Sequence, residues 1–330
     1  MGHRRAHHLD IRQQITDDII KAIEAGTPPW RKGWASGAMH CNAHSGQAYQ
    51  GINQVILGMQ PRKDPRWLTY KQAEHIGLQV RKGEHGVRIV KMVEVDRRRA
   101  ESAAGNDGEV LAEDGRKALV LKAYTVFNAE QIDGMEPLPE RKTDVTLHEA
   151  MEAMVWGMQD NGMKLNFGGN QPYYSPRTDA VHMPVASDFG GDMGQFYSTL
   201  AHELCHATGH PKRNARLHLD ARFGSAEYAR EELTAELASS LTLASMGGDL
   251  MPSSAVIEAN ASYMASWLEV LRKDKQEIFR VAAQAQKACD YLLARAMEAA
   301  PNMVDGQKEQ ASEMVCEPVQ AKAPSRPALG

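Results

Sequence analysis

The stretch TLAHELCHATGH, residues 199–210, restricts what this chain can fold into more than any other segment. It places His202 and His206 four residues apart, with Glu203 directly after the first histidine. Residues i and i+4 of a helix share one face, so both imidazoles can bind a single divalent ion. The glutamate can then turn toward a water molecule on that ion. The spacing therefore predicts a helix with a metal site.

The residues around this motif favour a helix that ends soon after it. Phe196 and Leu200 recur at helical spacing, and Gly209 is a natural helix end. His210 comes four residues after His206, where a longer three-histidine motif would need six. We therefore expect His210 to support the site from behind the ligands or to serve the fold alone. The alternative for the whole motif is a surface helix with two solvent-facing histidines, which would bind no metal.

A catalytic zinc site needs a third protein ligand and an open position for water. In the segment YAREELTAELASS, Glu232 and Glu236 are again four residues apart on a predicted helix. One carboxylate can bind the ion while the other hydrogen-bonds a ligand histidine. We predict that Glu232 is the ligand and Glu236 the supporting group, and the reverse assignment stays open. The expected cofactor is Zn²⁺ or another divalent ion such as Mn²⁺.

An open metal position beside a glutamate favours hydrolysis, although a purely structural ion stays an alternative. Glu203 is the predicted general base, which takes a proton from the attacking water. Tyr197 is a candidate hydrogen-bond donor to the oxyanion that forms, with Tyr173 or Tyr174 as alternatives. Packing in the core is an equally open role for each of these rings.

Helical and strand patterns alternate along the chain and predict an α+β protein of two domains. The predicted boundaries are 1–135 for the first domain, 136–143 for a linker, 144–298 for the second domain and 299–330 for a disordered tail. This tail is polar, proline-bearing and without periodicity. A length of 330 residues agrees with two domains of ordinary size.

Several elements are predicted within these boundaries. Ile11, Ile15 and Ile23 indicate a helix over 10–26. The rest of the first domain is expected to hold a helix near 70–77, a hairpin over 78–96 that turns at Gly83 and Gly86, a mobile loop over 100–118 and a strand over 118–134. The second domain is expected to hold helices over 145–162, 195–208, 226–246, 258–272 and 275–298, with short strands between the first two.

Composition limits where such a protein can act. No run approaches the ~18 apolar residues that a membrane span requires, and the N-terminal residues lack the apolar core of a secretory signal. The four cysteines show no CxxC or framework spacing, which favours a reducing compartment. We therefore expect a cytoplasmic protein with no membrane partner.

Charge is distributed unevenly along the chain. The formal net charge is −4, yet residues 1–99 hold seventeen Lys and Arg against nine Asp and Glu. A basic segment on an otherwise acidic chain indicates a polyanionic partner, whereas the alternative is an ordinary solvated surface.

Three of the five tryptophans lie within this basic segment. Aromatic faces among basic side chains hold single-stranded nucleic acid, because bases stack on the rings while phosphates meet the cations. Some of these rings must instead belong to the core. The predicted DNA-binding residues are Trp30, Arg31, Lys32, Trp34, Tyr49, Asn53, Trp67, Tyr70, Lys71, Arg81, Lys82 and Lys91.

The order of short motifs along the chain resembles one known family. PPWRKGW, WLTYKQA, VRKGEHG, YTVFN, HELCHATGH and YAREELTAEL follow one another as in the ArdC-type antirestriction proteins of plasmids. The similarity spans about residues 8–297, and the first domain also resembles part of plasmid primases. The resemblance implies a single-stranded-DNA-binding domain followed by a zincin-like metallopeptidase domain, a class that helps incoming plasmid DNA to escape restriction. Cys205 and Ala207 depart from the family pattern, and a thiol so near the ligands is expected to make the site sensitive to oxidation.

The expected partners are single-stranded DNA and a protein target such as a restriction enzyme subunit. One alternative function is a non-catalytic protein that coats DNA or blocks a nuclease and holds its metal for structure only. A primase-associated accessory protein is another alternative, although the chain shows no polymerase-type acidic triad or nucleotide-binding loop.

Overall fold

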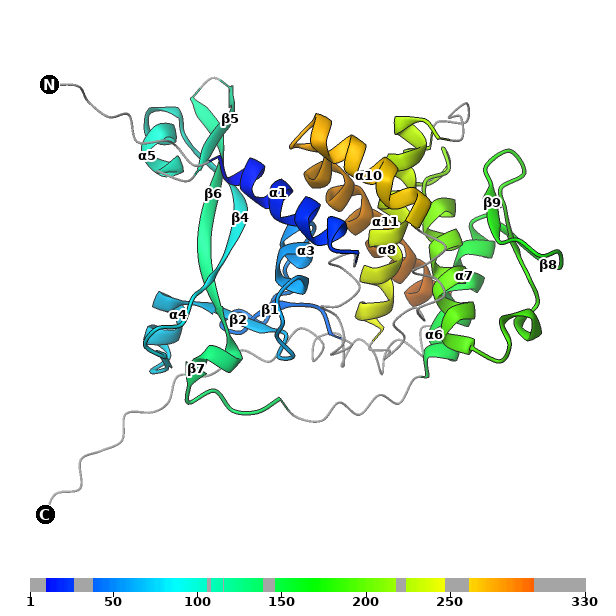
Figure 1. Ribbon diagram of the computed structural model, residues 1–330, viewed down its shortest axis with the longest axis horizontal. Helices are drawn as coiled ribbons and strands as arrows, with labels where there is room; N and C mark the ends of the chain where they lie inside the picture. The colour runs from blue at the N-terminus through cyan, green and yellow to red at the C-terminus, as the bar shows by residue number, and fades with distance from the viewer. Residues whose placement is uncertain are drawn as a thin grey trace, which may run out of the picture.

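The computed structural model describes residues 10–26, 38–105, 108–114, 116–138, 146–217, 224–246 and 261–299. Helices and strands are mixed along the chain, which confirms the predicted α+β class. In Figure 1, a part built around a sheet, residues 10–138, stands beside a mainly helical part, residues 146–299. Helix α1 reaches from the first part toward the second.

A five-stranded sheet forms the centre of the first part. Its order is β1-β2-β6-β4, and β5 also pairs with β6. All pairs are antiparallel except β1 with β2. The strands are β1 (Cys41–Asn42), β2 (Arg66–Thr69), β4 (Val87–Asp96), β5 (Glu109–Asp114) and β6 (Lys117–Asn128).

Two predictions about the strands of this part are wrong. Residues 78–96 do not pair as a hairpin, because β3 (Gln79–Val80) pairs with β7 (Ile132–Asp133) while β4 pairs with β6. Ten residues of β4 need a long partner, which β6 supplies and the two residues of β3 cannot. Residues 100–118 are not a loop throughout, since they contain α5 (Ala100–Ala104) and β5.

Short helices cover the sheet of the first part. The predicted helix over 10–26 is present as α1 (Ile11–Glu24), and Asp10 caps it by accepting hydrogen bonds from two backbone N–H groups. The helix predicted near 70–77 is present as α4 (Tyr70–His75). The remaining helical segments are α3 (Ile52–Gly58), η1 (Arg97–Arg99) and η2 (Ala129–Gln131).

The second part is a helical layer with one small sheet. α11 packs against α6, α7 and α8, and the sheet has the order β8-β10-β9 beside α7. All five helices predicted here are present. The elements are α6 (Leu147–Asp160), β8 (Lys164–Phe167), β9 (Tyr173–Ser175), β10 (Ala180–Met183), η3 (Ala186–Phe189), α7 (Met193–Thr208), α8 (Ala226–Ser245), α10 (Ala261–Lys273) and α11 (Glu277–Ala299).

The two parts share one hydrophobic core. α1 packs against α10, and α3 packs against α11. A single buried cluster contains Ile19 of α1 and Trp267 of α10. The hydroxyl of Thr16 donates a hydrogen bond to the carbonyl of Lys275 at 2.9 Å. The first helix is therefore an integral part of the layer that carries the second domain.

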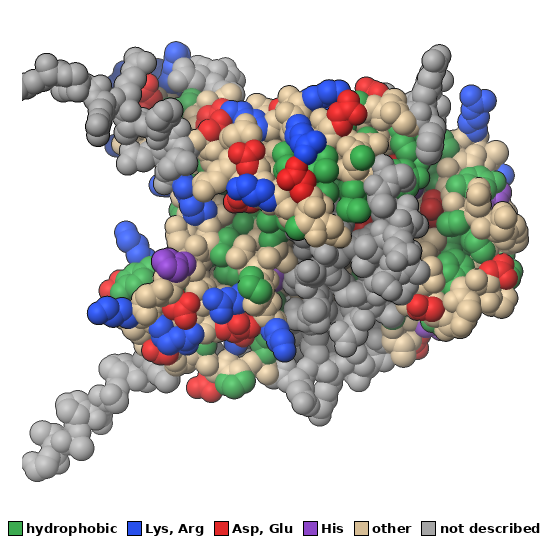
Figure 2. Space-filling model, viewed as in Figure 1, with side chains coloured by type: hydrophobic (Ala, Val, Ile, Leu, Met, Phe, Trp, Pro, Cys, Tyr) green, Lys and Arg blue, Asp and Glu red, His purple; other side chains and the backbone are tan. Residues whose placement is uncertain are grey.

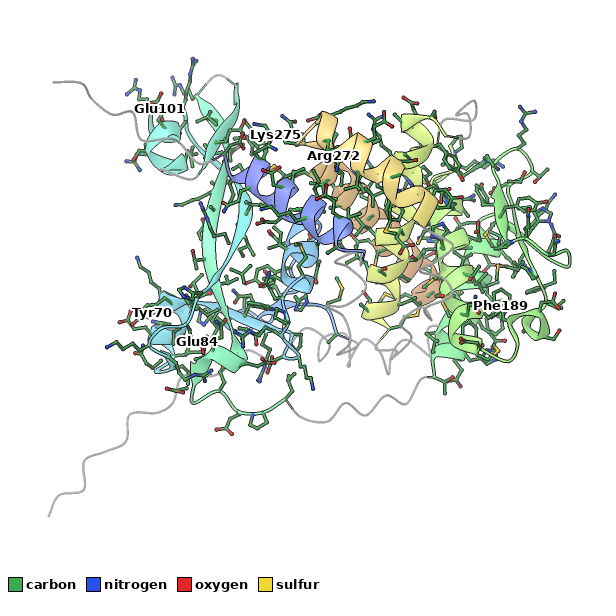
Figure 3. All side chains as sticks on the ribbon, viewed as in Figure 1. Tyr70, Glu84, Glu101, Phe189, Arg272 and Lys275 are labelled. Atoms are coloured by element: carbon green, nitrogen blue, oxygen red, sulfur yellow. The ribbon has the colours of Figure 1, made fainter. Side chains whose placement is uncertain are left out.

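At each end of α1, an ion pair joins the helix to the second part of the chain. Asp10 pairs with Lys275, and Glu24 pairs with Arg272; both basic residues are labelled in Figure 3. Residues 139–145 lie outside the described residues, as do those from 300 onward. The domain boundaries, the linker and the disordered tail thus stay predictions. No helix in the described ranges is both long enough and apolar enough to cross a membrane.

Candidate metal centre and nucleic-acid face

Helix α7 carries the two histidines of the motif. Asp192 caps its first turn, because its side chain accepts a hydrogen bond from the N–H of Gln195 at 2.9 Å. Leu204 is fully buried in the core. The neighbouring face of the helix turns His202 and His206 toward α8, which packs against α7.

Helix α8 brings carboxylates to these histidines. Ser225 caps it by accepting a hydrogen bond from the N–H of Tyr228 at 3.2 Å. Glu232 and Glu236 follow, one turn apart, and both lie among the buried or nearly buried side chains. A buried carboxylate needs a charged or hydrogen-bonding partner, and the histidines of α7 provide it.

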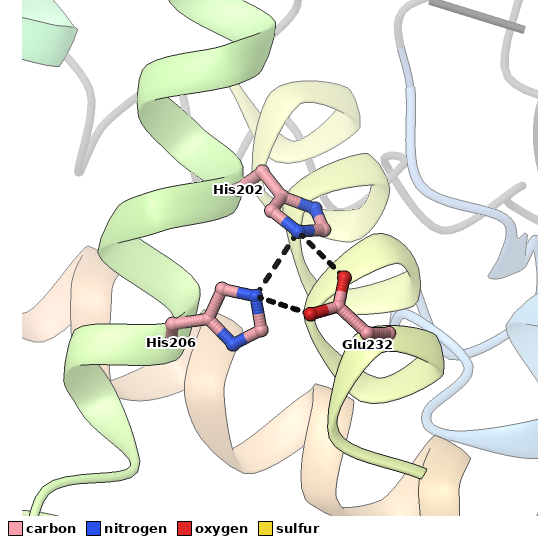
Figure 4. Close-up of side chains that lie close together, drawn as sticks. All are labelled: His202, His206 and Glu232. Carbon is pink, nitrogen blue, oxygen red and sulfur yellow. Dashed lines mark hydrogen bonds and ion pairs between the residues drawn. The ribbon is translucent and has the colours of Figure 1, made fainter. Parts of the chain in front are cut away.

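Three side chains from the two helices converge on one point. One ligating atom each of His202, His206 and Glu232 lies within 4.8 Å of the others. Figure 4 shows the arrangement: the two Nε2 atoms are 3.1 Å apart, and the Glu232 oxygens lie 3.6 Å from His202 Nε2 and 3.7 Å from His206 Nε2. Two imidazoles and one carboxylate are a donor set that fits Zn²⁺ and related divalent ions. The structure thus brings together the three residues predicted as ligands.

A further carboxylate stands behind each imidazole. Glu236 Oε2 is 3.8 Å from His202 Nδ1, and Glu231 Oε1 is 3.0 Å from His206 Nδ1. Partners at the second ring nitrogen orient a ligand histidine and leave Nε2 for the ion. This geometry favours Glu232 as the ligand and Glu236 as the supporting group over the reverse assignment.

Glu231 is the supporting residue that the sequence reasoning missed. Its carboxylate receives two hydrogen bonds from Arg216, at 2.8 and 2.9 Å. Arg216 also donates to Thr208 Oγ1 at 2.6 Å and to the carbonyl of Cys205. The loop after α7 is thereby tied to α8 through the carboxylate that holds His206. The acidic run EELTAE was the available signal in the sequence. Its first glutamate, Glu231, can be assigned to the ring of His206 only when the angle at which α8 crosses α7 is known.

His202 and Glu232 shift each other's pKa in opposite directions. Burial disfavours the charged form of His202, but the neighbouring carboxylates, Glu232 first, outweigh it and raise the pKa of His202 to about 9. Burial likewise disfavours the charge of Glu232, yet the bond from His202 and the charge of His206 lower the pKa of Glu232 to about 2. A divalent ion held here would replace the proton on His202, because a ligating imidazole must be neutral.

Glu203 lies on α7 between the two ligand histidines in sequence and is only 7 % exposed. Burial is the main reason why the pKa of Glu203 is raised above its ordinary value. The backbone N–H of Tyr174 on β9 hydrogen-bonds this carboxyl group. A carboxyl group with a raised pKa, fixed beside two candidate ligands, is suited to proton transfer.

The tyrosines predicted as oxyanion donors have other contacts. Tyr197 stands five residues before His202, so it points to another side of α7, and its hydroxyl hydrogen-bonds the ring of His148 on α6. Tyr173 stacks on His182 with ring centroids 4.4 Å apart. The structure therefore does not bring Tyr197 to the three ligating atoms.

A different tyrosine contacts the ligand group. The hydroxyl of Tyr228 hydrogen-bonds Glu232 and lies 3.3 Å from the hydroxyl of Tyr263 on α10. Sequence reasoning did not select Tyr228, although it stands four residues before Glu232 and so shares its face of α8.

His210 belongs to a separate polar network. Its Nδ1 is 3.8 Å from Asp179 Oδ2, and it accepts a hydrogen bond from the N–H of Lys212 at 3.2 Å. Asp179 also accepts from the Tyr174 hydroxyl at 2.8 Å and from Arg213 at 3.2 Å. This network joins β9 to the loop after α7. These contacts favour a structural role for His210 over a role in supporting the metal ligands.

The thiol nearest the ligands is deeply buried. Cys205 and Cys289 are both free and buried, and burial raises the pKa of the Cys205 thiol. Oxidation proceeds through the thiolate of an accessible cysteine. The expected sensitivity of the site to oxidation at Cys205 is therefore not supported by its surroundings.

Four of the predicted DNA-binding residues, Trp30, Arg31, Lys32 and Trp34, lie outside the described residues. Two others serve the fold. Trp67 is fully buried, and its Nε1 donates to His40 Nδ1 at 3.1 Å, so the prediction that bases stack on it is wrong. The amide of Asn53 donates to the Val90 carbonyl at 2.7 Å and accepts from the Val90 N–H at 3.0 Å, which fastens α3 to β4.

The remaining candidates differ in exposure. Tyr49 is half-buried, and its hydroxyl accepts a hydrogen bond from Asn42 at 3.2 Å. Arg81 is exposed but pairs with Glu84 at 3.0 Å. In Figure 2, basic and acidic side chains alternate over the part that carries α4 and β2, so no uniform basic patch covers it in this view. The candidates that stay exposed and without a described acidic partner are Tyr70, Lys71, Lys82 and Lys91.

Comparison with known proteins gives two family matches along the chain. Residues 9–127 match the N-terminal domain of anti-restriction factor ArdC, and residues 149–284 match a zincin-like metallopeptidase. The crystal structure of antirestriction protein ArdC from plasmid R388, in its metal-free form, is 36% identical with a TM-score of 0.70, over 88% of this chain and 99% of that chain. Its Mn(II)-bound form is also 36% identical with a TM-score of 0.69, over 87% and 98%.

Relatives found by sequence include proteins much longer than this chain. A DNA primase TraC of Escherichia coli is 38% identical over 86% of this chain, but the match spans only 27% of the primase. A second TraC primase of the same species matches over 20% of its own length. Protein y4eC of Sinorhizobium fredii is 36% identical over 90% of this chain and 96% of its own.

Proposed function

Because the chain belongs to the family of ArdC antirestriction proteins, we propose that it protects incoming plasmid DNA from restriction by hydrolysing a protein target. The observation that carries this proposal is the convergence of His202, His206 and Glu232 with the buried Glu203 beside them. The match of residues 149–284 to a zincin-like metallopeptidase supports it. The Mn(II)-bound relative supports a divalent ion at this position.

In the proposed hydrolysis, the metal ligands and Glu203 have different roles. A divalent ion held by His202, His206 and Glu232 would act as a Lewis acid toward a peptide carbonyl and would lower the pKa of water. Glu203 accepts a proton from the attacking water and passes it to the leaving amine. Its burial keeps bulk water from competing for that proton.

Tyr228 takes the part that the sequence pattern assigned to Tyr197. Its hydroxyl contacts the carboxylate of Glu232 and lies within hydrogen-bond distance of the Tyr263 hydroxyl. This hydroxyl has one proton, which it donates to Glu232 in the structure and can turn to donate to negative charge that develops on the substrate. The protein target would be a restriction enzyme subunit or another protein of the cytoplasm, where restriction enzymes meet entering DNA.

We predict that Tyr228→Phe lowers peptide turnover about 10²- to 10³-fold, the usual cost of one such donor. The variant should keep the metal content of the wild type, because no ligand atom is lost. Turnover of a labelled unfolded protein, together with metal analysis, measures both. Tyr197→Phe is the matched control and should keep its turnover; a greater loss there than at Tyr228 would restore the role first assigned to Tyr197.

The second component of the proposal is single-stranded DNA binding by the first part of the chain. Exposed basic residues such as Lys71, Lys82 and Lys91, with the half-exposed ring of Tyr70, support it. A non-catalytic protein that coats DNA is the second candidate function, and a primase-associated role is its variant. The similarity to a segment of two TraC primases favours a DNA-handling role that does not depend on hydrolysis.

We expect the full chain to bind single-stranded DNA more tightly than duplex of the same sequence, because paired bases cannot stack on aromatic rings. Affinity should fall steeply with salt, since lysine and arginine displace counterions from phosphates. Fluorescence anisotropy over a salt series measures both properties. The full chain is needed because α1 and α3 pack on the helices of the second part. Preference for duplex, or an affinity that ignores salt, would refute the DNA component.

A further inference from the structure

The sheet of the first part narrows to two strands at one place. β5 pairs with β6 over Lys117–Leu121, and β2 pairs with it over Val126–Asn128. Residues 122–125 of β6 therefore pair with β4 alone. Figure 1 shows this narrow ribbon between the end that carries α5 and β5 and the end that carries α4 and β2. We call residues 88–91 of β4 and 122–125 of β6 the waist.

The waist contains a pair of lysines that face each other. Lys91 of β4 is directly opposite Lys122 of β6 in the antiparallel register. Among the described residues, neither lysine forms an ion pair with a carboxylate, and Lys91 is exposed. Like charges directly opposite on two strands destabilise a sheet. The pair costs the fold stability, which a bound anion between the two ammonium groups would recover.

An aromatic ring lies next to this pair on the same face. Tyr124 follows Lys122 by two residues, and alternate residues of a strand share a face. The ammonium group of Lys122 lies over its ring, 5.6 Å from the centroid. Tyr124 is half-buried and packs against the core, with part of the residue accessible to solvent. The waist therefore offers two cations and an aromatic face within one short stretch.

We propose that the waist is where single-stranded DNA crosses the protein, with a phosphate between Lys91 and Lys122 and a base on the ring of Tyr124. The inference rests on the proposed DNA-binding function and gives it a location. Of the twelve residues expected from sequence, only Lys91 belongs to it. Single-stranded nucleic acid is the polyanion that fits, because it presents phosphates and unpaired base faces together. A duplex offers the phosphates without the free faces.

The substitution Lys122→Glu distinguishes a role of Lys122 in DNA binding from a role in the stability of the fold. The substitution turns a like-charge pair into an opposite-charge pair with Lys91, which stabilises neighbouring strands. We expect a melting temperature equal to or above that of the wild type, with at least a tenfold loss of affinity for a labelled thymidine oligonucleotide. The double variant Lys91→Ala, Lys122→Ala should reduce the slope of log affinity against log salt by about 0.7, since it frees the one phosphate between them and each neutralised phosphate contributes about 0.7 for single strands.

Further variants test the base contact and correct for net charge. Tyr124→Leu keeps an apolar side chain but removes the stacking face, and should lower affinity about tenfold or more. Lys164→Ala with Lys287→Ala removes the same charge from two exposed lysines of the second part and should leave affinity and slope nearly unchanged. Wild-type affinity and slope in the waist variants would overturn the location while leaving DNA binding in place. Absence of single-strand binding by the wild type would overturn both this location and the DNA-binding component of the proposed function.

Discussion

Alanine at His202 or at His206 is expected to abolish tight metal binding, while the wild type binds about one divalent ion per chain. Both residues point Nε2 at the same spot, with Glu232 as the third donor, and two ligands of three cannot hold the ion. Metal analysis after dialysis against a weak chelator, with unfolding followed in parallel, measures the effect. Retention of full stoichiometry in both variants would refute the site.

Neighbouring residues provide graded controls for this experiment. His210→Ala should retain the ion, because His210 contacts Asp179 and Lys212. Glu236→Ala should weaken binding by about 10- to 100-fold, the usual cost of losing a residue that orients a ligand. Glu232→Ala should weaken it more, and the opposite ranking would exchange the roles of these two glutamates.

Glu203→Gln is expected to lower peptide turnover about 10²- to 10⁴-fold without loss of the ion, the range for removal of a general base. Glutamine keeps the size of the side chain and its hydrogen bond from the Tyr174 N–H, but it cannot accept the proton of water. Turnover and metal content are measured on the same preparations. Glu298→Gln, at an exposed position of α11, is the matched control. Full turnover in Glu203→Gln would remove this residue from the chemistry.

The metal ligands could be predicted from sequence because helix geometry alone places them. His202 and His206 share a face through their spacing, and so do Glu232 and Glu236. Which of the two glutamates approaches Nε2 of the histidines depends on the angle at which α7 crosses α8. The residue spacing along the sequence does not determine that angle. The same angle brings Glu231 to His206 Nδ1, and Arg216 reaches Glu231 only through the fold of the loop after α7.

The strands and the aromatic residues were harder to predict from sequence for a related reason. β4 alternates as a strand should, but its partner β6 comes after α5 and β5 in the chain, so local pattern suggested a nearer partner. Trp67 stands among basic residues in sequence, yet it lies on a central strand with its ring in the core. Lys91 and Lys122 are neighbours only through the register of that pairing.

Whether hydrolysis at the metal site protects incoming DNA is tested most directly by a protection assay in cells that express the wild type or Glu203→Gln. Transfer of unmodified plasmid DNA into a restricting host is measured for both, and the metal content of both purified proteins is determined. We expect equal metal content and equal single-strand binding, with protection lost in the variant. Full protection by a Glu203→Gln protein that holds its metal would rule out hydrolysis as the means of protection and favour the non-catalytic DNA-binding function.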